Sequence, residues 1–259
     1  MEGLVTRPRS HEELQVCLDD LKQVISKGGY SLDAFFYESV GSTNDEAKSL
    51  RAPALIIALE QTQGKGRMGR RWSSIRDQGL YFSLRLEPKM SPELMPAITQ
   101  LTALAVARVL GEKALIKWPN DIYIGDKKIC GILCEMTLVG ETIDALVIGV
   151  GLNLRPVEVE GRLTTSIEEE QLDLTRMSFL EHFLEQFYSL YDHFIEVESL
   201  ESWMDEINQK SYLMHRSVRT EDGKNYTFQG ISPEGDALLR HGDETRKVFF
   251  GELSLKVEP

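Results

Sequence analysis

The apolar run Ala54–Leu59 (ALIIAL) is the feature that most constrains how this chain can fold. A strand with no polar position is covered on both faces, because neither row of its side chains gains from contact with water. Further apolar stretches at Leu80–Leu86, Ile129–Met136 and Ala145–Val150 predict neighbouring strands, and Pro96–Leu110 has the apolar spacing of a helix. The sequence therefore predicts an α+β fold in which helices cover a sheet.

The two ends of the chain differ from this central part. Near the N-terminus, Ser10–Glu13 has the residues of a capping box, and the apolar spacing that follows predicts one helix ending at Gly28. Towards the C-terminus, turn signals recur at intervals of about 8–12 residues, which is typical of a small antiparallel barrel. We therefore expect a helical extension over residues 1–30, a central domain over 31–210 and a small β-barrel over 211–259.

The charge balance excludes some classes of partner. The chain has 29 Lys and Arg against 41 Asp and Glu, a formal net charge of −12, which repels nucleic acid and anionic membranes, so any anion site must be local. The three cysteines, Cys17, Cys130 and Cys134, suit neither a disulfide framework nor a zinc site, which favours a reducing compartment. Neither a signal peptide nor an apolar run of about 18 residues is recognised, so we expect a cytoplasmic protein without a membrane span.

The glycine-rich stretch Gly64–Trp72 (GKGRMGRRW) is the first candidate functional motif. It contains G-x-G-x-x-G, but a dinucleotide fingerprint needs a helix directly after the glycines, and Arg70–Gln78 has no helical apolar period. The loop carries four cations, Lys65, Arg67, Arg70 and Arg71. Because glycines let backbone amides approach an anion and arginines bind phosphate or carboxylate, the motif predicts a site for an acid and a nucleotide. The alternative is a solvated hairpin tip.

The second motif is Lys117–Asp121 (KWPND). Pro119 fixes the backbone at the end of a predicted strand, and Asn120 and Asp121 offer an amide and a carboxylate suited to a hydroxyl or a hydrated magnesium ion. An ordinary turn is the alternative. Lys128 follows at the base of a predicted hairpin, where a solvated lysine is the usual interpretation, so only the combination of motifs favours function.

Five motifs together carry a resemblance to a known family. They are Ser42-Thr43-Asn44, Gln61 with the Gly64–Arg70 loop, Lys117–Asp121, Lys127-Lys128 with Gly131-Ile132, and Gly149–Asn153. In order and spacing, over roughly residues 35–155, they resemble the biotin protein ligases. The resemblance implies a mixed-sheet catalytic domain of the biotin/lipoate-ligase type, here residues 31–210, followed by an SH3-like C-terminal barrel.

The same resemblance implies a two-step reaction. Biotin and ATP, with Mg²⁺, would give biotinyl-5′-AMP, and the biotin would then pass to one lysine of the biotin carboxyl carrier protein of a biotin-dependent carboxylase. The loop cations Lys65, Arg67 and Arg70 would offset the repulsion between the two anions. Because the mixed anhydride hydrolyses, a loop that orders over it would also exclude water.

The resemblance also assigns residues to sites. The biotin site would take Ser42, Thr43, Asn44, Gln61, Gly64, Lys65, Gly66, Arg67, Lys128 and Gly131. The ATP site would take Arg67, Arg70, Trp72, Lys117, Asn120 and Asn153. Arg67, Lys128 and Asp121 are the expected catalytic residues, with Asp121 the candidate for the metal or for the incoming lysine and no other metal ligand assigned.

Two departures from the family pattern shape the expectations. Lys65 stands where the family often has arginine, which keeps the charge but loses the bidentate fork. Members that act as repressors carry a winged helix-turn-helix ahead of the catalytic domain, whereas the first 30 or so residues here predict one helix containing Asp19 and Asp20. We therefore expect no DNA partner, no membrane partner, and a homodimer only as a family tendency.

Two other functions stay open at this point. A lipoate or octanoate ligase shares the fold and also modifies a lysine, but is expected to have an apolar tunnel in place of the Gly64–Arg70 loop. A non-enzymatic module that senses biotin or its adenylate is the other alternative. Lys128 together with the loop argues against it, because a passive sensor need not activate a carboxylate.

Overall fold

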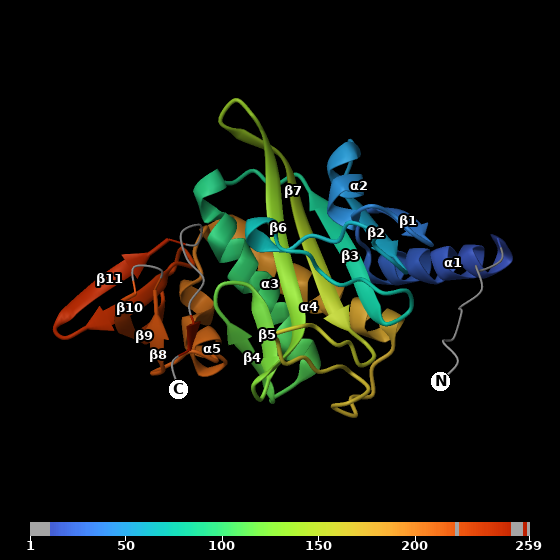
Figure 1. Ribbon diagram of the computed structural model, residues 1–259. Helices are drawn as coiled ribbons and strands as arrows, with labels where there is room; N and C mark the ends of the chain where they lie inside the picture. The colour runs from blue at the N-terminus through green and yellow to red at the C-terminus, as the bar shows by residue number, and fades with distance from the viewer. Residues whose placement is uncertain (1–10, 221–222, 250–255, 258–259) are drawn as a thin grey trace.

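The computed structural model describes residues 11–220, 223–249 and 256–257. Its main feature is a seven-stranded mixed sheet with the order β1-β2-β3-β7-β6-β5-β4 (Figure 1). The strands are β1 (Asp33–Tyr37), β2 (Ala54–Ala58), β3 (Gly79–Leu86), β4 (Ala114–Lys117), β5 (Asp121–Ile124), β6 (Lys127–Val139) and β7 (Thr142–Asn153). The predicted α+β class is confirmed. The predicted apolar strands are β2, β3, β6 and β7 of this sheet, and the predicted apolar helix is a helix that packs on it.

Only one pair in this sheet is parallel. β1 runs parallel to β2, with Phe35 opposite Ile56, and every other neighbouring pair is antiparallel. Parallel strands need a crossover connection, and the connection here contains the short helix α2 (Thr43–Ser49). The crossover sets the Ser42-Thr43-Asn44 motif on one face of the sheet.

Three helices cover the opposite face and form the main core with it. They are α1 (His11–Gly28), α3 (Met95–Leu110) and α4 (Arg176–Val197). In Figure 1, α3 and α4 lie behind the sheet, and α1 lies at its β1 end, where it packs on α4 and β1. Phe179, Phe183 and Phe187 of α4 are fully buried, so the aromatic face of this helix is part of the core. The predicted N-terminal helix is also confirmed, although Ser10 of its capping box lies outside the described residues.

The helical segment Pro92–Leu110 is the one part of the described chain that is long and apolar enough to cross a membrane, with a mean hydropathy of 1.3. In the structure 67% of it is buried, and α3 packs between the sheet and α4. A buried core helix meets the same criterion of length and composition, so the segment is explained as the centre of the core.

The face that carries α2 is left largely open. Ala47 of α2 packs on Ala54 and Ile56 of β2 and on Val147 of β7, but no other helix of the described chain packs there. Because side chains alternate along a strand, the residues of β7 that face this side are Val147, Gly149 and Gly151, while Ile148 and Val150 face the core. Because Gly149 and Gly151 have no side chains, this face of β7 has a hollow above it.

A second sheet of five antiparallel strands follows α5 (Met204–Gln209), in the order β11-β10-β9-β8-β12. Its strands are β8 (Ser217–Arg219), β9 (Asn225–Ile231), β10 (Ala237–His241), β11 (Glu244–Val248) and β12 (Lys256–Val257). It stands beside the larger sheet in Figure 1. Antiparallel pairing agrees with the expected small barrel, while the domain bounds at 30 and 210 stay predictions.

The two sheets are joined by specific contacts at β4. The Ile116 amide donates to the Lys210 carbonyl at 2.7 Å, and the Tyr212 amide donates to the Ile116 carbonyl at 2.9 Å. The Trp118 indole nitrogen donates to the Gly235 carbonyl at 3.0 Å. The KWPND motif is therefore held from two sides by the C-terminal part of the chain.

Candidate active site

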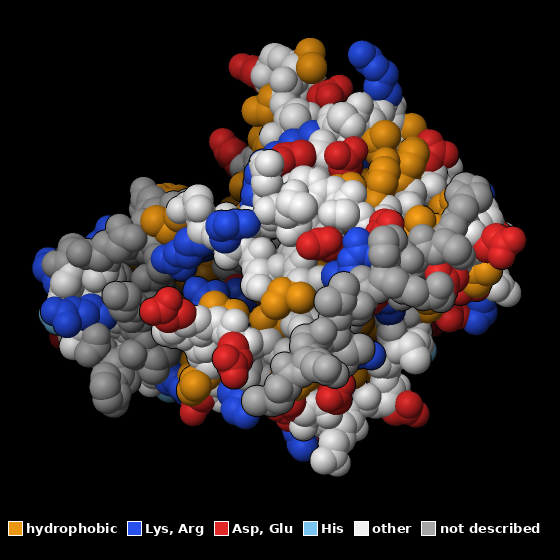
Figure 2. Space-filling model, turned by 45° about the vertical axis from the view of Figure 1, so that its right-hand side comes forward, with side chains coloured by type: hydrophobic (Ala, Val, Ile, Leu, Met, Phe, Trp, Pro, Cys, Tyr) orange, Lys and Arg blue, Asp and Glu red, His pale blue; other side chains and the backbone are white. Residues whose placement is uncertain are grey.

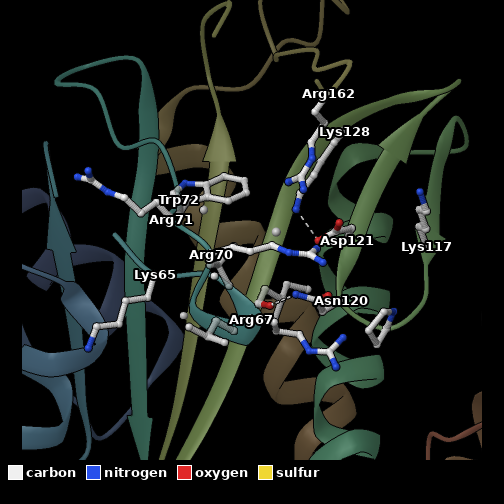
Figure 3. A pocket seen from close by; sticks show the side chains of 18 of the residues that line it. Lys65, Arg67, Arg70, Arg71, Trp72, Lys117, Asn120, Asp121, Lys128 and Arg162 are labelled. Atoms are coloured by element: carbon white, nitrogen blue, oxygen red, sulfur yellow. Dashed lines mark hydrogen bonds and ion pairs between the residues drawn. The ribbon is translucent and has the colours of Figure 1, made fainter. Parts of the chain in front are cut away.

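A cavity of about 550 Å³ lies on the open face of the larger sheet, between α2, the glycine-rich loop and the KWPND motif. Figure 2 shows Lys and Arg side chains gathered where the C-terminal part meets the larger sheet, and Figure 3 shows the cavity at close range. Fourteen predicted residues line it: Ser42, Thr43, Asn44, Gln61, Lys65, Gly66, Arg67, Arg70, Trp72, Lys117, Asn120, Asp121, Lys128 and Gly131. Segments far apart in the sequence therefore form one site.

Glycines form the floor of the cavity, and Trp72 lies against them. A Cβ atom on Gly151 would lie 2.4 Å from the indole nitrogen Nε1 of Trp72, and one on Gly131 would lie 2.7 Å from its Cζ3 atom. Gly131 and Gly151 are partners across β6 and β7, so the gap is continuous. Trp72 Nε1 is buried without a hydrogen-bond partner among the described residues, which leaves a donor at the cavity floor.

At one end of the cavity, uncharged side chains form a hydrogen-bonded network. The Thr43 amide and hydroxyl each reach Gln61 Oε1, at 2.9 and 3.0 Å. The Ser83 hydroxyl lies 2.8 Å from Thr43 Oγ1 and 2.6 Å from Asn44 Oδ1. Ser42, Thr43 and Asn44 are all buried. The network fixes the orientation of the amides and hydroxyls before a ligand enters.

The amide of Asn44 is oriented by residues of β6. Its Nδ2 atom donates to Glu135 Oε2 at 2.7 Å and to the Leu133 carbonyl at 3.2 Å, and Glu135 also pairs with Lys48 at 2.5 Å. A Cβ on Gly149 would lie 2.1 Å from Asn44 Oδ1, so Gly149 gives the amide its space. Sequence reasoning missed Ser83 and Glu135; their only signal is a polar residue within an apolar strand.

The other end of the cavity is charged, and Lys128 lies at its centre. The Lys128 ammonium is 2.5 Å from Asp121 Oδ1 and 4.9 Å from the centre of the Trp72 ring, and its side chain is only 6% exposed. The usual interpretation of a solvated lysine is therefore wrong here. A buried ammonium persists where a carboxylate compensates it, and Asp121 supplies that charge.

The glycine-rich loop contributes its cations unequally. In Figure 3 the Arg70 side chain extends towards Asp121, whereas Lys65 and Arg71 point away from it. Lys65 pairs with Asp45 of α2 at 2.6 Å, and Arg71 donates to the Thr62 carbonyl at 3.0 Å. Burial lowers the pKa of the Arg67 guanidinium.

The structure also decides between the alternatives for this loop. No helix occurs within Arg70–Gln78, which excludes the dinucleotide fingerprint. The loop does turn back on itself, with the Gly66 amide donating to the Arg70 carbonyl at 2.7 Å, but Arg67 and Arg70 line the cavity. Most of the loop is exposed, so it is partly a solvated hairpin, but the place of Arg67 and Arg70 in the cavity lining favours an anion site.

At the far edge of the charged end, Lys117 is surrounded by aromatic rings. Its ammonium lies 3.3 Å from the Tyr123 hydroxyl, 4.6 Å from the centre of that ring and 5.4 Å from the centre of the Tyr212 ring. Burial lowers the pKa of Lys117. Tyr123 and Tyr212 were not predicted as site residues, and Tyr212 comes from a segment that the sequence places after the central domain.

Two predicted residues do not line this cavity. The Asn153 side chain is buried and donates to the carbonyls of Thr165 at 3.0 Å and Lys128 at 3.5 Å, so it fastens the segment after β7 to the start of β6. Gly64 lies in the turn of the loop, where a Cβ would lie 2.6 Å from the Trp72 carbonyl oxygen. Both residues act on the backbone around the site.

Comparison with known proteins agrees with the geometry. The model of the biotin/lipoate A/B protein ligase family matches residues 37–153. The bifunctional ligase/repressor BirA of Bacillus subtilis is 31% identical over 245 residues, covering 85% of this chain and 73% of that protein. The biotin–[acetyl-CoA-carboxylase] ligase of Paracoccus denitrificans is 33% identical, covering 81% of this chain and 97% of that protein.

A solved structure extends the similarity to three dimensions. The biotin protein ligase from Aquifex aeolicus, in complex with biotin and ATP, superposes with a TM-score of 0.76 at 27% identity, covering 87% of this chain and 99% of that one. The chain belongs to the biotin/lipoate A/B protein ligase family, on the side of the biotin protein ligases. The resemblance drawn from its motifs and the expectation of a ligase are confirmed.

Proposed function

We propose that this protein joins biotin to ATP and then transfers the biotin to a lysine of a biotin carboxyl carrier protein. The observation that carries the proposal is one cavity with two unlike ends on a glycine floor. The uncharged network around Thr43 and Asn44 suits the ureido group of biotin, which offers both donors and an acceptor. The cations beyond Trp72 suit a carboxylate and a triphosphate.

In the first step, a carboxylate oxygen of biotin forms a bond to the α-phosphorus of ATP, and the bond from that phosphorus to pyrophosphate breaks. Lys128, already buried beside the floor, would donate hydrogen bonds to the carboxylate and later to the acyl-phosphate oxygens. Arg67 and Arg70 would face the phosphates and stabilise the charge that develops there. Lys65 is paired with Asp45 and lacks the bidentate fork of an arginine, so we expect it to contribute less to ligand binding than Arg67 and Arg70.

In the second step, the amine of the carrier lysine attacks the acyl carbon, a C–N bond forms, and the bond to the AMP oxygen breaks. The amine loses a proton as it attacks. Asp121 is the carboxylate at the charged end that would receive it, with Lys128 Nζ 2.5 Å away to hold its orientation. The glycine-rich loop lies over the same end and would exclude water from the mixed anhydride.

Magnesium would enter with the nucleotide. Among the described residues no group of three or more His, Cys, Asp or Glu could hold a metal ion, and magnesium commonly relies on substrate phosphates with one or two carboxylates. Asp121, with the neighbouring Asn120 amide, fits that limited contribution. The ion would supply charge neutralisation on the phosphates.

The proposed partners and location follow the relatives only in part. We infer a carboxylase carrier as the protein substrate from the printed name of the Paracoccus ligase, and a cytoplasmic location, because Cys130 and Cys134 are free and buried thiols. We also infer that repression, named for the Bacillus relative, is not a property of the described residues, because α1 is the one helix that they form before β1 and it packs on α4 and β1. Binding of operator DNA in a gel-shift assay would contradict this. Whether the protein forms a homodimer can be tested by measuring its molecular mass in solution.

The direct test is biotin-dependent exchange of labelled pyrophosphate into ATP, with lipoate and octanoate as parallel substrates. We expect exchange with biotin alone, and its loss in Arg67→Ala, with Arg51→Ala as a matched control because Arg51 is exposed and lies outside the cavity. Exchange with lipoate or octanoate would assign the protein to the other ligases of this fold. Binding of biotin without exchange would favour a sensing module.

A further inference from the structure

Lys117 is held in a different way from the other lysines of the cavity. Lys65 pairs with Asp45 and Lys128 pairs with Asp121. Lys117 lies opposite Asp121 across β4 and β5, and the charge of Asp121 acts on it, but within the described part of the chain Lys117 forms no ion pair with a carboxylate. Its neighbours are the faces of Tyr123 and Tyr212. Aromatic faces attract an ammonium without cancelling its charge, so the charge stays available to an anion in the cavity.

Tyr212 is itself held by two further side chains, Arg216 and Asp126. The Arg216 guanidinium lies 4.0 Å from the centre of its ring, and its hydroxyl donates to Asp126 Oδ1 at 2.8 Å. Its ring centre is 5.0 Å from that of Tyr123. Only 7% of Tyr212 is exposed, so the ring has one position between Arg216 and Lys117.

The backbone beside Lys117 is tied to the same segment. Ile116 exchanges hydrogen bonds with Lys210 and Tyr212, and Trp118 donates to the Gly235 carbonyl. Both neighbours of Lys117 in the sequence are thus attached to the chain that leads into, or forms, the second sheet. Among the described residues beyond 210, Tyr212 lines the cavity, so it is where this part of the chain reaches the site.

We propose that Tyr212 is a positioning residue for nucleotide binding, which holds the Lys117 ammonium towards the cavity and thereby makes the affinity for ATP, but not for biotin, depend on the C-terminal part of the chain. The inference rests on the proposed function for the identity of the ligands. The uncharged network lies at the opposite end, between α2 and β3, and shares no residue with this cluster.

The test is calorimetry of the full chain with α,β-methylene ATP, which cannot be cleaved at the bond that breaks, and separately with biotin. Tyr212→Leu removes the ring, and we expect its affinity for the analogue to fall about tenfold. Tyr212→Phe keeps the ring and loses only the hydrogen bond to Asp126, so it should retain most of the affinity. Biotin affinity should stay within about twofold in both variants.

A double-mutant cycle separates positioning from a merely structural contribution. If Tyr212 acts through Lys117, Tyr212→Leu should cost almost nothing further in a Lys117→Met protein. Additive losses, or equal losses of analogue and biotin affinity, would overturn the proposal. Should Tyr212→Leu fail to fold, Arg216→Met removes the outer half of the stack at a partly exposed position, and an unchanged affinity for the analogue there would also overturn it.

The outcome is distinguishable from failure of the proposed function. A wild-type protein that binds the analogue but exchanges no pyrophosphate with biotin would refute the ligase reaction, while the effect of Tyr212 on nucleotide binding could still be measured. Normal exchange with unchanged analogue affinity in Tyr212→Leu would refute only the inference about Tyr212.

Discussion

At the end of the cavity beneath α2, the side chains of Thr43, Asn44 and Ser83 belong to a hydrogen-bonded network that extends to Gln61 and Glu135. At the other end, Lys128 is held by an ion pair and Lys117 by aromatic rings. The first end is made within the larger sheet and its crossover. The second depends on a loop and on a segment that belongs with the second sheet. Shape and hydrogen-bond direction are set at one end, and charge is set at the other.

The difference indicates how each end should respond to change. A buried hydrogen-bonded network is sensitive to displacement of a single atom, because a lost hydrogen bond leaves a buried group unsatisfied. A cluster of cations is sensitive to removal of charge and tolerant of small movements. Four substitutions or conditions probe this contrast.

The largest effect is expected at the charged end from Lys128→Met. The variant removes the buried ammonium beside Asp121, and we expect kcat/KM for biotin-dependent pyrophosphate exchange to fall at least about a hundredfold. Lys127→Met is the matched control, since Lys127 is the exposed neighbour in the sequence. A loss of less than tenfold in Lys128→Met would mean that Lys128 is not the main cation acting on the carboxylate.

Gly149→Ala tests the uncharged end by displacement alone. The added Cβ would lie 2.1 Å from Asn44 Oδ1, so the amide must move, and we expect the free energy of unfolding to fall by about 1–3 kcal/mol together with a higher KM for biotin. Urea unfolding measures the free energy, and the pyrophosphate-exchange assay measures KM for biotin. Gly41→Ala is the control, because no atom lies within 4 Å of its added Cβ. Equal behaviour of the two variants would argue against a rigid network.

Glu135→Gln is a milder test of the same end. A neutral amide keeps one acceptor for Asn44 but loses the ion pair with Lys48, so KM for biotin should rise about three- to tenfold while KM for ATP stays unchanged. Glu141→Gln, at the tip of the same hairpin, is the control. An equal rise in both KM values would mean that the two ends are not independent.

The smallest effect is expected from pH, and at the charged end only. Burial lowers the pKa of Lys117 below its usual 10.5, so the ammonium loses its proton at a lower pH than a solvated lysine. Affinity for α,β-methylene ATP should therefore weaken as pH rises towards that lowered pKa, whereas biotin affinity should not follow it. Calorimetry across the alkaline range checks this, and Lys117→Arg should remove the dependence because arginine stays protonated.

Sequence reasoning reached most of the cavity because its residues lie in short, dense motifs. The apolar runs also identified the strands, since burial of both faces leaves a pattern that needs no knowledge of the partner strands. The parallel pairing of β1 with β2 and the place of β7 between β3 and β6 could not be predicted, because these pairings depend on contacts between distant segments.

The missed residues have a common physical reason. Ser83 lies within an apolar strand, and its hydroxyl finds its hydrogen-bond partners, Thr43 and Asn44, only when α2 packs over the strand. Tyr212 lies 95 positions along the chain from Lys117, whose ammonium its ring faces. In both cases the partner is supplied by tertiary structure. For Lys128 the local sequence alone fits a solvated lysine, because burial beside Asp121 is supplied by tertiary structure; its combination with the other motifs is what predicted a site residue.

The position of β7 has a consequence for how the chain is made. β7 pairs with β3 through residues 146–153 and with β6 along nearly its whole length, so β1, β2 and β3 cannot join the rest of the sheet before residue 153 has left the ribosome. Until then the apolar strand Ala54–Ala58 lacks part of its cover. During synthesis, β1, β2 and β3 with α2 therefore leave the ribosome with apolar surface exposed. In this interval, aggregation or binding by chaperones would compete with folding.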